Sequence, residues 1–331
     1  MKLKRGVMRA SEFADLEWVN CEPMTLESLR GRVVVVHFWD YTCTNCLRAV
    51  AYVKVWHGRY ADKGLVIVGV HSPEFEFGHD AGNVRRAVEE LGLPFPVASD
   101  NSFATWHAYS NRFWPATYLV DRDGFLSDYH FGEGGYQDTE TAVQALLREV
   151  NPRLLLPKVI EPLRPEDSGI IQIRPVSPEI YLGYRRGRLG NPEGFVPGGV
   201  VAYARPATLV KDVCYADGEF LNRTDCLEHV GAGTGRVILS YDAVDVSVVV
   251  EPARDAGVQR FAVEQDGRPV DKAAMGESLT PGADGPGVDV DAPRLYHIVR
   301  NPECDRHTLA LVTSSPGLRF YCISFVGSCA A

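Results

Sequence analysis

Two cysteines with a two-residue spacing stand near the start of the chain. Cys43 and Cys46 enclose Thr44 and Asn45, and they closely follow an apolar run over residues 33–39. Two thiols at this spacing can exchange electrons with another disulfide through a mixed disulfide. The pair is therefore the first candidate for chemistry, as a dithiol that alternates with a disulfide.

A helix is predicted to carry this pair. From Cys43 to about Tyr60, apolar residues recur at helical spacing among arginines and lysines. The first cysteine then lies at the exposed start of the helix, where unpaired N–H groups and the helix dipole favour a thiolate. Cys43 is thus the expected nucleophile, and Cys46, one turn further on, is the expected resolving thiol.

A zinc site is the alternative that a bare cysteine pair leaves open, because zinc often takes two cysteines at this spacing. The nearest candidates for a second half, Cys304 and His307, lie far along the chain in a strand-rich region. The order of strand, cysteine pair and helix favours redox chemistry instead. The sequence therefore predicts no metal and no other cofactor.

The elements around the pair predict an α/β domain. Apolar runs indicate buried parallel strands, and the segments between them have helical periodicity. The expected parallel strands are 33–39 and 65–70, and segments 116–121 and 125–131 are expected to form a hairpin joined by residues 122–124. The expected helices are 43–60, 82–91, 101–109 and 139–150. Strand, helix and strand in this order make a βαβ crossover that places the cysteines at the end of a strand.

The second half of the chain has a different pattern. Prolines at 152, 157, 162 and 165 indicate an extended connection, so the predicted domains are residues 1–155 and 156–331. Short β-branched runs beyond it predict an all-β sandwich of jelly-roll type. The expected strands are 200–203, 237–241, 244–250, 258–264, 295–300, 308–313 and 318–325. Asp266 and Gly267 are expected to form a hairpin turn.

Composition excludes some classes of function. The chain has 331 residues, and its 34 Lys and Arg against 43 Asp and Glu give a formal net charge of -9, which argues against nucleic acid as a partner. No apolar run approaches the ~18 residues of a membrane span. Acidic residues follow the basic N-terminus, so the sequence as written predicts a cytoplasmic protein, whereas a chain trimmed of its leader would be extracytoplasmic. Eight cysteines do not decide the compartment.

The residues around the pair resemble those of a known family. The run 36–46 is similar to the active-site signature of thioredoxin-like proteins of the TlpA/DipZ type. Residues 114–119 resemble the cis-proline segment of that family, and residues 131–134 resemble the turn before its last helix. These motifs occur in the family's order over residues 11–150. The resemblance implies a thioredoxin-like first domain and, as in the DipZ-like members, a following β-sandwich likened to carbohydrate-binding modules.

The resemblance also implies roles for residues outside the pair. Pro115 would be a cis proline opposite the sulfurs, which leaves the backbone of Trp114 to pair with an extended substrate. An ordinary turn proline is the other interpretation. Tyr41 and Thr42, which adjoin the first cysteine, are expected to bind the substrate together with Trp114.

Three further titratable residues are candidates near the thiols. Glu74 corresponds to an acidic residue that would tune the pKa values of the cysteines, with Glu76 as a competitor in the same loop and a solvated carboxylate as the other interpretation of both. The family usually has a carboxylate or an amide six residues before the first cysteine, where this chain has His37. This histidine is interpreted either as a base for Cys46 near neutral pH or as a core histidine bonded to backbone.

The predicted function is thiol–disulfide exchange with a protein or small-molecule substrate and an unidentified electron partner. A peroxiredoxin-like peroxide reductase is disfavoured, since it would have Pro and Thr where Val36 and Asp40 stand. A carbohydrate-binding or partner-binding protein with an accessory redox site is the third possibility, because exposed aromatic rings can stack on sugars. The second half supplies Tyr181, Tyr184, Tyr203, Tyr241, Tyr296 and Tyr321.

Overall fold

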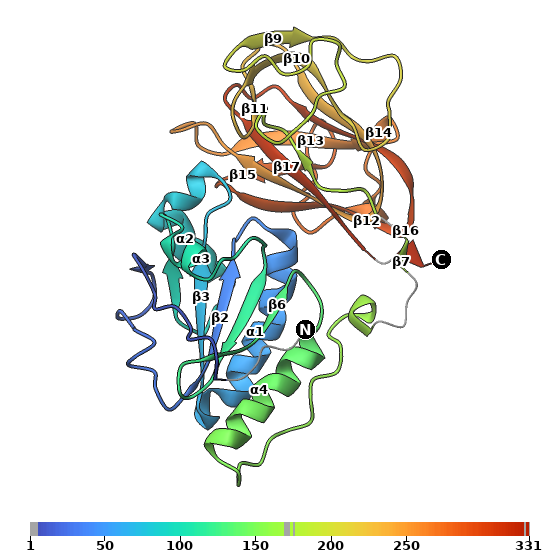
Figure 1. The fold of residues 1–331 in the computed structure, drawn as a ribbon. Coiled ribbons are helices and arrows are strands. Elements are labelled where there is room, and N and C mark those ends of the chain that lie inside the picture. The colour runs from blue at the N-terminus through green and yellow to red at the C-terminus, as the bar shows by residue number, and fades with distance from the viewer. Residues whose placement is uncertain (1–5, 169–172, 175, 328, 331) are drawn as a thin grey trace. The chain divides into compact units, whose positions relative to one another are not determined.

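The computed structural model describes residues 6–168, 173–174, 176–327 and 329–330. The chain divides into two compact units, Met1–Asp167 and Ser168–Ala331 (Figure 1). Each unit has its own hydrophobic core. The division falls after residue 167, whereas the prolines of the connection suggest a boundary at 155.

The first unit contains a six-stranded sheet in the order β1-β4-β3-β2-β5-β6. Its strands are β1 (Glu17–Trp18), β2 (Val33–Trp39), β3 (Leu65–His71), β4 (Val97–Ser99), β5 (Ala116–Val120) and β6 (Leu126–Phe131). The central pairs β2–β3 and β3–β4 are parallel, and the other pairs are antiparallel. The carboxyl ends of β2 and β3 therefore lie side by side, and the cysteine pair follows one of them.

Helices cover this sheet. They are α1 (Thr44–Tyr60), α2 (Ala81–Glu90), α3 (Ala104–Ala108) and α4 (Tyr136–Val150), with short 3-10 turns η1 (Ala61–Lys63), η2 (Glu76–His79) and η3 (Pro165–Ser168). The rings of Tyr52 on α1 and Tyr136 on α4 stack with centroids 3.7 Å apart, so these two helices lie side by side. All four helices expected from the sequence are confirmed, with ends that shift by a few residues.

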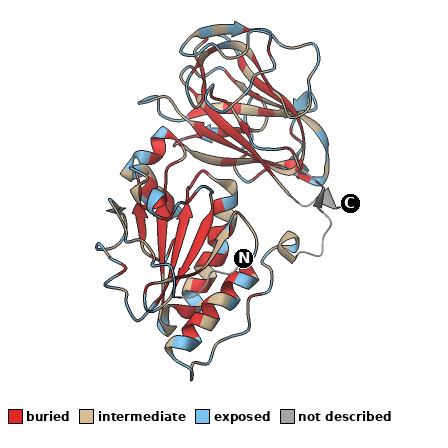
Figure 2. Cartoon of the chain, in the orientation of Figure 1, coloured by how far each residue is buried: buried red, intermediate tan, exposed pale blue. Residues whose placement is uncertain are grey.

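The central strand β2 is buried over its whole length (Figure 2). Val34, Val36 and Phe38 point into a core cluster that includes Trp106 of α3. Because side chains alternate along a strand, His37 and its alternate neighbours face the other side of the sheet. The cysteine-bearing turn is thus anchored to a strand that packs on both faces.

Residues 156–167 pack on the first unit although they form almost no regular structure. The Leu163 N–H donates to the Tyr52 hydroxyl at 2.7 Å, and that hydroxyl donates to the Asp167 carboxylate at 2.6 Å. The Ile160 N–H donates to the buried Glu140 carboxylate at 2.8 Å. Prolines remove regular structure from this segment without detaching it, which explains why the division falls later than the prolines suggest.

The second unit is all β. Its strands are β7 (Ile173–Arg174), β8 (Ile180–Tyr181), β9 (Val200–Tyr203), β10 (Cys214–Asn222), β11 (Leu227–His229), β12 (Gly235–Glu251), β13 (Gln259–Gln265), β14 (Arg268–Pro269), β15 (Gly287–Val290), β16 (Arg294–Thr313), β17 (Arg319–Val326) and β18 (Cys329–Ala330), with one 3-10 turn, η4 (Lys272–Ala274). β12 pairs with β10 near its start and with β17 near its end. Since β10 pairs with β11 and β11 with β17, these four strands form a closed ring.

Two expected pairs of short strands are single long strands. Segments 237–241 and 244–250 both lie in β12, and 295–300 and 308–313 both lie in β16. Register shifts in the pairing of β12 with β16, between Ala243 and Asp245 and between Val246 and Ser247, let the long strands bend over the core. The α/β thioredoxin-like unit followed by an all-β sandwich is confirmed. No helix of the described residues combines the length and apolar character needed to cross a bilayer.

Candidate active site

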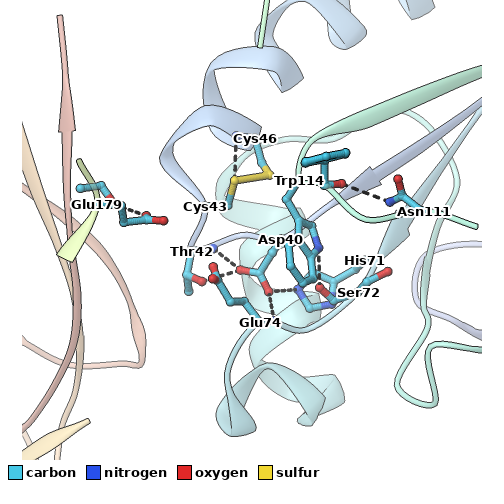
Figure 3. Close-up of a disulfide and its surroundings, with 12 residues drawn as sticks. Asp40, Thr42, Cys43, Cys46, His71, Ser72, Glu74, Asn111, Trp114 and Glu179 are labelled. Carbon is cyan, nitrogen blue, oxygen red and sulfur yellow. Dashed lines mark hydrogen bonds and ion pairs between the residues drawn. A yellow bond between two sulfur atoms is a disulfide. The ribbon is translucent and has the colours of Figure 1, made fainter. Parts of the chain in front are cut away.

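The two cysteines of the predicted pair form a disulfide at the start of α1 (Figure 3). Cys43 is the N-cap residue, and its sulfur accepts a hydrogen bond from the Cys46 N–H at 3.1 Å. Cys43 is half-buried, whereas Cys46 has no exposed surface. An incoming sulfur can therefore reach Cys43 and not Cys46, which supports their predicted roles as nucleophile and resolving thiol.

A tight turn after β2 places Cys43 at the start of α1. The Cys43 N–H donates to the Asp40 carbonyl oxygen at 3.3 Å, and the Thr42 N–H donates to Asp40 Oδ1 at 2.6 Å. Aspartate is favoured at the first position of such a turn because its side chain accepts the N–H two residues further on. The Thr42 hydroxyl donates to the same oxygen. Asp40 thus fixes the turn that places the nucleophile.

The second oxygen of Asp40 links this turn to the loop after β3. Oδ2 accepts from the Glu74 N–H at 2.9 Å and lies 3.4 Å from His71 Nε2. Asp40 is 1% exposed and His71 is fully buried. Burial by itself would raise the pKa of Asp40, but the His71 contact and charge, with the Thr42 and Glu74 donors, outweigh it and lower that pKa. The carboxylate is held in its ionised form.

The sequence interpretation did not identify Asp40 and His71 as site residues. A signal for them exists, because polar residues at the carboxyl ends of neighbouring parallel strands meet at the same edge of a sheet. Trp39, the last residue of β2, pairs directly with His71, the last residue of β3, and Asp40 follows Trp39. The ring of Tyr41 stacks on His71 with centroids 5.3 Å apart, which closes the imidazole in.

A third loop carries Pro115. The peptide bond between Trp114 and Pro115 is cis, as the resemblance implies. The Pro115 carbonyl oxygen accepts from the Gly132 N–H at 2.8 Å, and Trp114 Nε1 donates to the Ser72 carbonyl oxygen at 3.0 Å. The Trp114 indole therefore ties this loop to the loop after β3, which Asp40 ties to the cysteine turn (Figure 3).

Two expected substrate-binding side chains do not present a surface. Tyr41 is 5% exposed and Thr42 is 2% exposed. Thr42 instead donates to Asp40 within the turn, and Tyr41 stacks on His71, so substrate binding by these two side chains stays a prediction. Trp114 is partly exposed and remains the candidate for substrate contact.

The remaining candidates lie at different depths. His37 is 1% exposed, and its Nδ1 lies 3.0 Å from the Thr117 hydroxyl of β5. Desolvation lowers the pKa of His37 to about 4. Glu74 is partly exposed beside the Asp40 turn, whereas Glu76 is exposed on η2. Glu74 thus joins the Asp40 turn through its N–H, and an effect of its carboxylate on the thiols stays a prediction.

The alternative metal ligands have other partners. Cys304 is in a disulfide, and His307 Nδ1 lies 2.8 Å from an Asp266 carboxylate oxygen. Among the residues that the structure describes, no three His, Cys, Asp or Glu side chains gather as metal ligands would.

The tyrosines of the second unit lie mostly in its core. Four of them are between 0% and 5% exposed: Tyr203, Tyr241, Tyr296 and Tyr321. Their rings are not available to stack on a sugar. Tyr184 is exposed, and its hydroxyl pairs with that of Thr224 at 2.9 Å.

Comparisons with known proteins agree with this geometry. The model of the AhpC/TSA family matches residues 10–129, and the model described as thioredoxin like C-terminal domain matches residues 177–325. Protein DipZ of Mycobacterium bovis and of Mycobacterium tuberculosis is 34% identical over 80% of this chain. The chain spans only 37% of the length of these DipZ relatives.

Two shorter relatives match the first unit. The thiol-disulfide oxidoreductase YkuV of Bacillus subtilis is 32% identical over 45% of this chain and 99% of its own length. The thiol-disulfide oxidoreductase ResA of Halalkalibacterium halodurans is 30% identical over 45% of this chain and 81% of its own. With a cysteine pair at the head of a helix and a cis proline in the predicted places, the chain belongs to the thioredoxin-like thiol–disulfide oxidoreductases of the TlpA/DipZ type.

Proposed function

We propose that this chain exchanges the Cys43–Cys46 dithiol with disulfides of protein or small-molecule substrates. The observation that carries the proposal is the unequal exposure of the two sulfurs at the start of α1, with Cys43 half-buried and Cys46 fully buried. Helix N–H groups and the helix dipole stabilise a thiolate on Cys43. The Cys43 sulfur is thus accessible and activated, whereas the Cys46 sulfur is buried and can react only with Cys43.

In the reducing direction, the Cys43 thiolate attacks one sulfur of a substrate disulfide. A bond forms between the two sulfurs, the substrate S–S bond breaks, and the other substrate sulfur leaves as a thiolate that takes up a proton. Cys46 then loses its proton and attacks Cys43, which forms the intramolecular disulfide and releases the second substrate thiolate. Two electrons pass from the protein to the substrate, and an external dithiol restores the pair by the same steps in reverse.

The loop at Trp114 and Pro115 is the proposed docking place for the substrate backbone. Trp114 is partly exposed, and its position is set by its hydrogen bond to Ser72. An extended segment beside a disulfide could add to this loop as a strand adds to a sheet edge, which would align its sulfur with Cys43.

Reduction of insulin by a dithiol donor tests the proposal. We expect the unchanged chain to accelerate reduction, Cys43→Ser to abolish the effect, and Cys46→Ser to accumulate a mixed disulfide with the substrate. No cysteine-dependent acceleration with insulin or a small disulfide would overturn the proposal. Peroxide consumption that survives Cys46→Ser would instead favour the peroxidase alternative.

A sugar site on the second unit is a weaker proposal, supported by the exposed ring of Tyr184 alone. A glycan array probed with the full chain tests it, with Tyr184→Ala as the variant and Tyr203→Phe, which keeps a buried ring, as the control. Binding that Tyr184→Ala does not reduce would assign the sugar contact elsewhere, and no binding would refute the proposal.

A further inference from the structure

The buried pair of Asp40 and His71 beside the nucleophile poses a physical problem. Asp40 shares a four-residue turn with Cys43, and its carboxylate organises that turn through the Thr42 N–H and hydroxyl. A carboxylate without a counter-charge at this place would disfavour a second negative charge on the Cys43 sulfur. The turn therefore needs the aspartate for its geometry, while the chemistry needs its charge balanced.

His71 is placed to balance that charge. Its Nε2 lies 3.4 Å from Asp40 Oδ2, and neither side chain is more than 1% exposed. When the imidazole is protonated, its positive charge interacts strongly with the carboxylate, because water does not screen groups that are buried. Tyr41 and Trp39 enclose the ring, with centroids 5.3 Å and 5.6 Å from that of His71. The histidine is thus fixed against the carboxylate on the side away from solvent.

We propose that His71 is a positioning residue for the thiol–disulfide exchange: it compensates the buried Asp40 carboxylate, so that this carboxylate can hold the Cys43 turn without opposing the thiolate. This inference rests on the proposed function and deepens it. The lowered pKa of Asp40 agrees with it, since the contact with His71 helps to overcome the effect of burial.

Other titratable groups surround the pair and must be separated from it. Glu74 contributes its N–H to Asp40 and carries its own carboxylate in the same loop, and Tyr41 covers the imidazole. From η2, Gly78 approaches the carboxylate, with a Cβ at that position falling 3.7 Å from Asp40 Oδ2. The titratable side chains of η2, Glu76 and His79, are exposed and therefore screened by water.

The decisive experiment measures the pKa of the Cys43 thiol from the pH dependence of its alkylation rate in the reduced full chain. We expect His71→Gln to raise this pKa by about one unit, which lowers the thiolate fraction near neutral pH up to about tenfold. Asp40 keeps its donors from Thr42 and Glu74 in that variant. Adding Asp40→Asn to His71→Gln removes the uncompensated charge and should bring the pKa back.

The matched control is Glu140→Gln. Glu140 is also a buried carboxylate in an ion pair, with Arg59 Nη1 at 2.9 Å, but it lies on α4. This variant should lower stability and leave the Cys43 pKa unchanged. Glu74→Gln and Tyr41→Phe, measured alongside, report the contribution of each neighbouring group.

Several outcomes would overturn the inference. A His71→Gln protein with the Cys43 pKa of the unchanged chain would do so, as would a double variant shifted as far as the single one. If His71→Gln fails to fold, the Cys43 pKa is measured in the single variant Asp40→Asn. Loss of the negative charge should not raise this pKa, and a raised pKa would contradict the inference. Alkylation needs no substrate, so an unchanged chain that fails to reduce insulin refutes the proposed function without touching this measurement.

Discussion

His37 of β2 and Thr117 of β5 face each other across an antiparallel strand pair, and Nδ1 of the histidine lies 3.0 Å from the threonine hydroxyl. The imidazole is buried, and desolvation lowers its pKa to about 4. A base that weak accepts a proton poorly from a thiol with a pKa of about 8.5. The geometry therefore favours a core histidine, bonded to a side chain rather than to the backbone as the sequence suggested.

Acid should destabilise the first unit through His37. The unfolded chain binds a proton there below about pH 6.5, whereas the folded chain resists it down to about pH 4. This contribution to stability is therefore complete above pH 6.5 and is lost as the pH falls from 6.5 to 4, with about 2 kcal/mol gone at pH 5. Urea unfolding at pH 7.5 and pH 5 measures the loss.

Two variants separate this effect from others. His37→Gln should flatten the pH dependence between 6.5 and 4, while the control His79→Gln, at an exposed position, should not. The lowered pKa of Asp40 acts in a different window, because its contribution is lost only as the pH falls through values below 3.8. A His37→Gln protein that loses stability as steeply as the unchanged chain would contradict the burial argument.

Alkylation of the reduced protein should single out one thiol. Cys43 is half-buried at a helix start, and so is expected to react with iodoacetamide at pH 7 on the order of tenfold faster than Cys21. Cys21 is a matched comparison, since it is also partly exposed but desolvation raises its pKa. Burial raises the pKa values of Cys214 and Cys226 to about 12, which leaves them unreactive. Mass spectrometry after a short pulse checks this, and faster labelling of Cys46 than of Cys43 would reverse the proposed roles.

The hydrogen bond between Trp114 and Ser72 should matter for protein substrates. Trp114→Phe removes the indole N–H that donates to the Ser72 carbonyl oxygen at 3.0 Å, at a cost of about 1 kcal/mol. We expect the KM for a protein disulfide to rise about fivefold and the rate with a small disulfide to change little. Trp56→Phe is the control, because the buried Trp56 Nε1 has no hydrogen-bond partner in the described part of the chain. If the two variants raise the KM for the protein disulfide equally, the hydrogen bond of Trp114 has no specific role in substrate binding.

Cutting the chain at the proline-based boundary should weaken the first unit. A fragment of residues 1–155 lacks the donors that Ile160 and Leu163 supply to Glu140 and Tyr52, and the Asp167 carboxylate as well. At about 1 kcal/mol for each of these three hydrogen bonds, residues 1–167 should be more stable by at least about 3 kcal/mol. Urea titration of both fragments measures the difference. Leu155→Ser in the longer fragment is a neutral control, since Leu155 is 90% exposed.

The elements that hold the disulfide can be predicted to within one residue. β2, α1 and β3 have long, uninterrupted apolar or helical patterns, and these patterns determine their ends. β1 and β4 are too short to form a pattern. β10 was not predicted because Asp217, Gly218 and Glu219 interrupt its alternation, so the strand becomes evident only from its pairing with neighbours on both sides.

The cysteine pair could be predicted because its two members are close in sequence. The partnership of Asp40 and His71 could not be read in the same way, since a strand pairing brings together residues that a whole βαβ crossover separates. The burial of Thr42 could not be predicted either, because it depends on the hydrogen bond from the Thr42 N–H to the Asp40 side chain. The spacing of residues in the sequence thus predicts the reacting cysteines. The residues that hold the cysteine turn in place depend on the register between strands, which local spacing does not reveal.

The ring of β12, β10, β11 and β17 in the second unit has a consequence for how that unit comes apart. A strand at the end of an open sheet can fray by losing one ladder, but each strand of a closed circuit is held on two sides. None of the four can leave without breaking at least two ladders, and β10, β12 and β17 each have a third. Their amide hydrogens should therefore exchange with solvent together, as one cooperative block, instead of strand by strand from an edge.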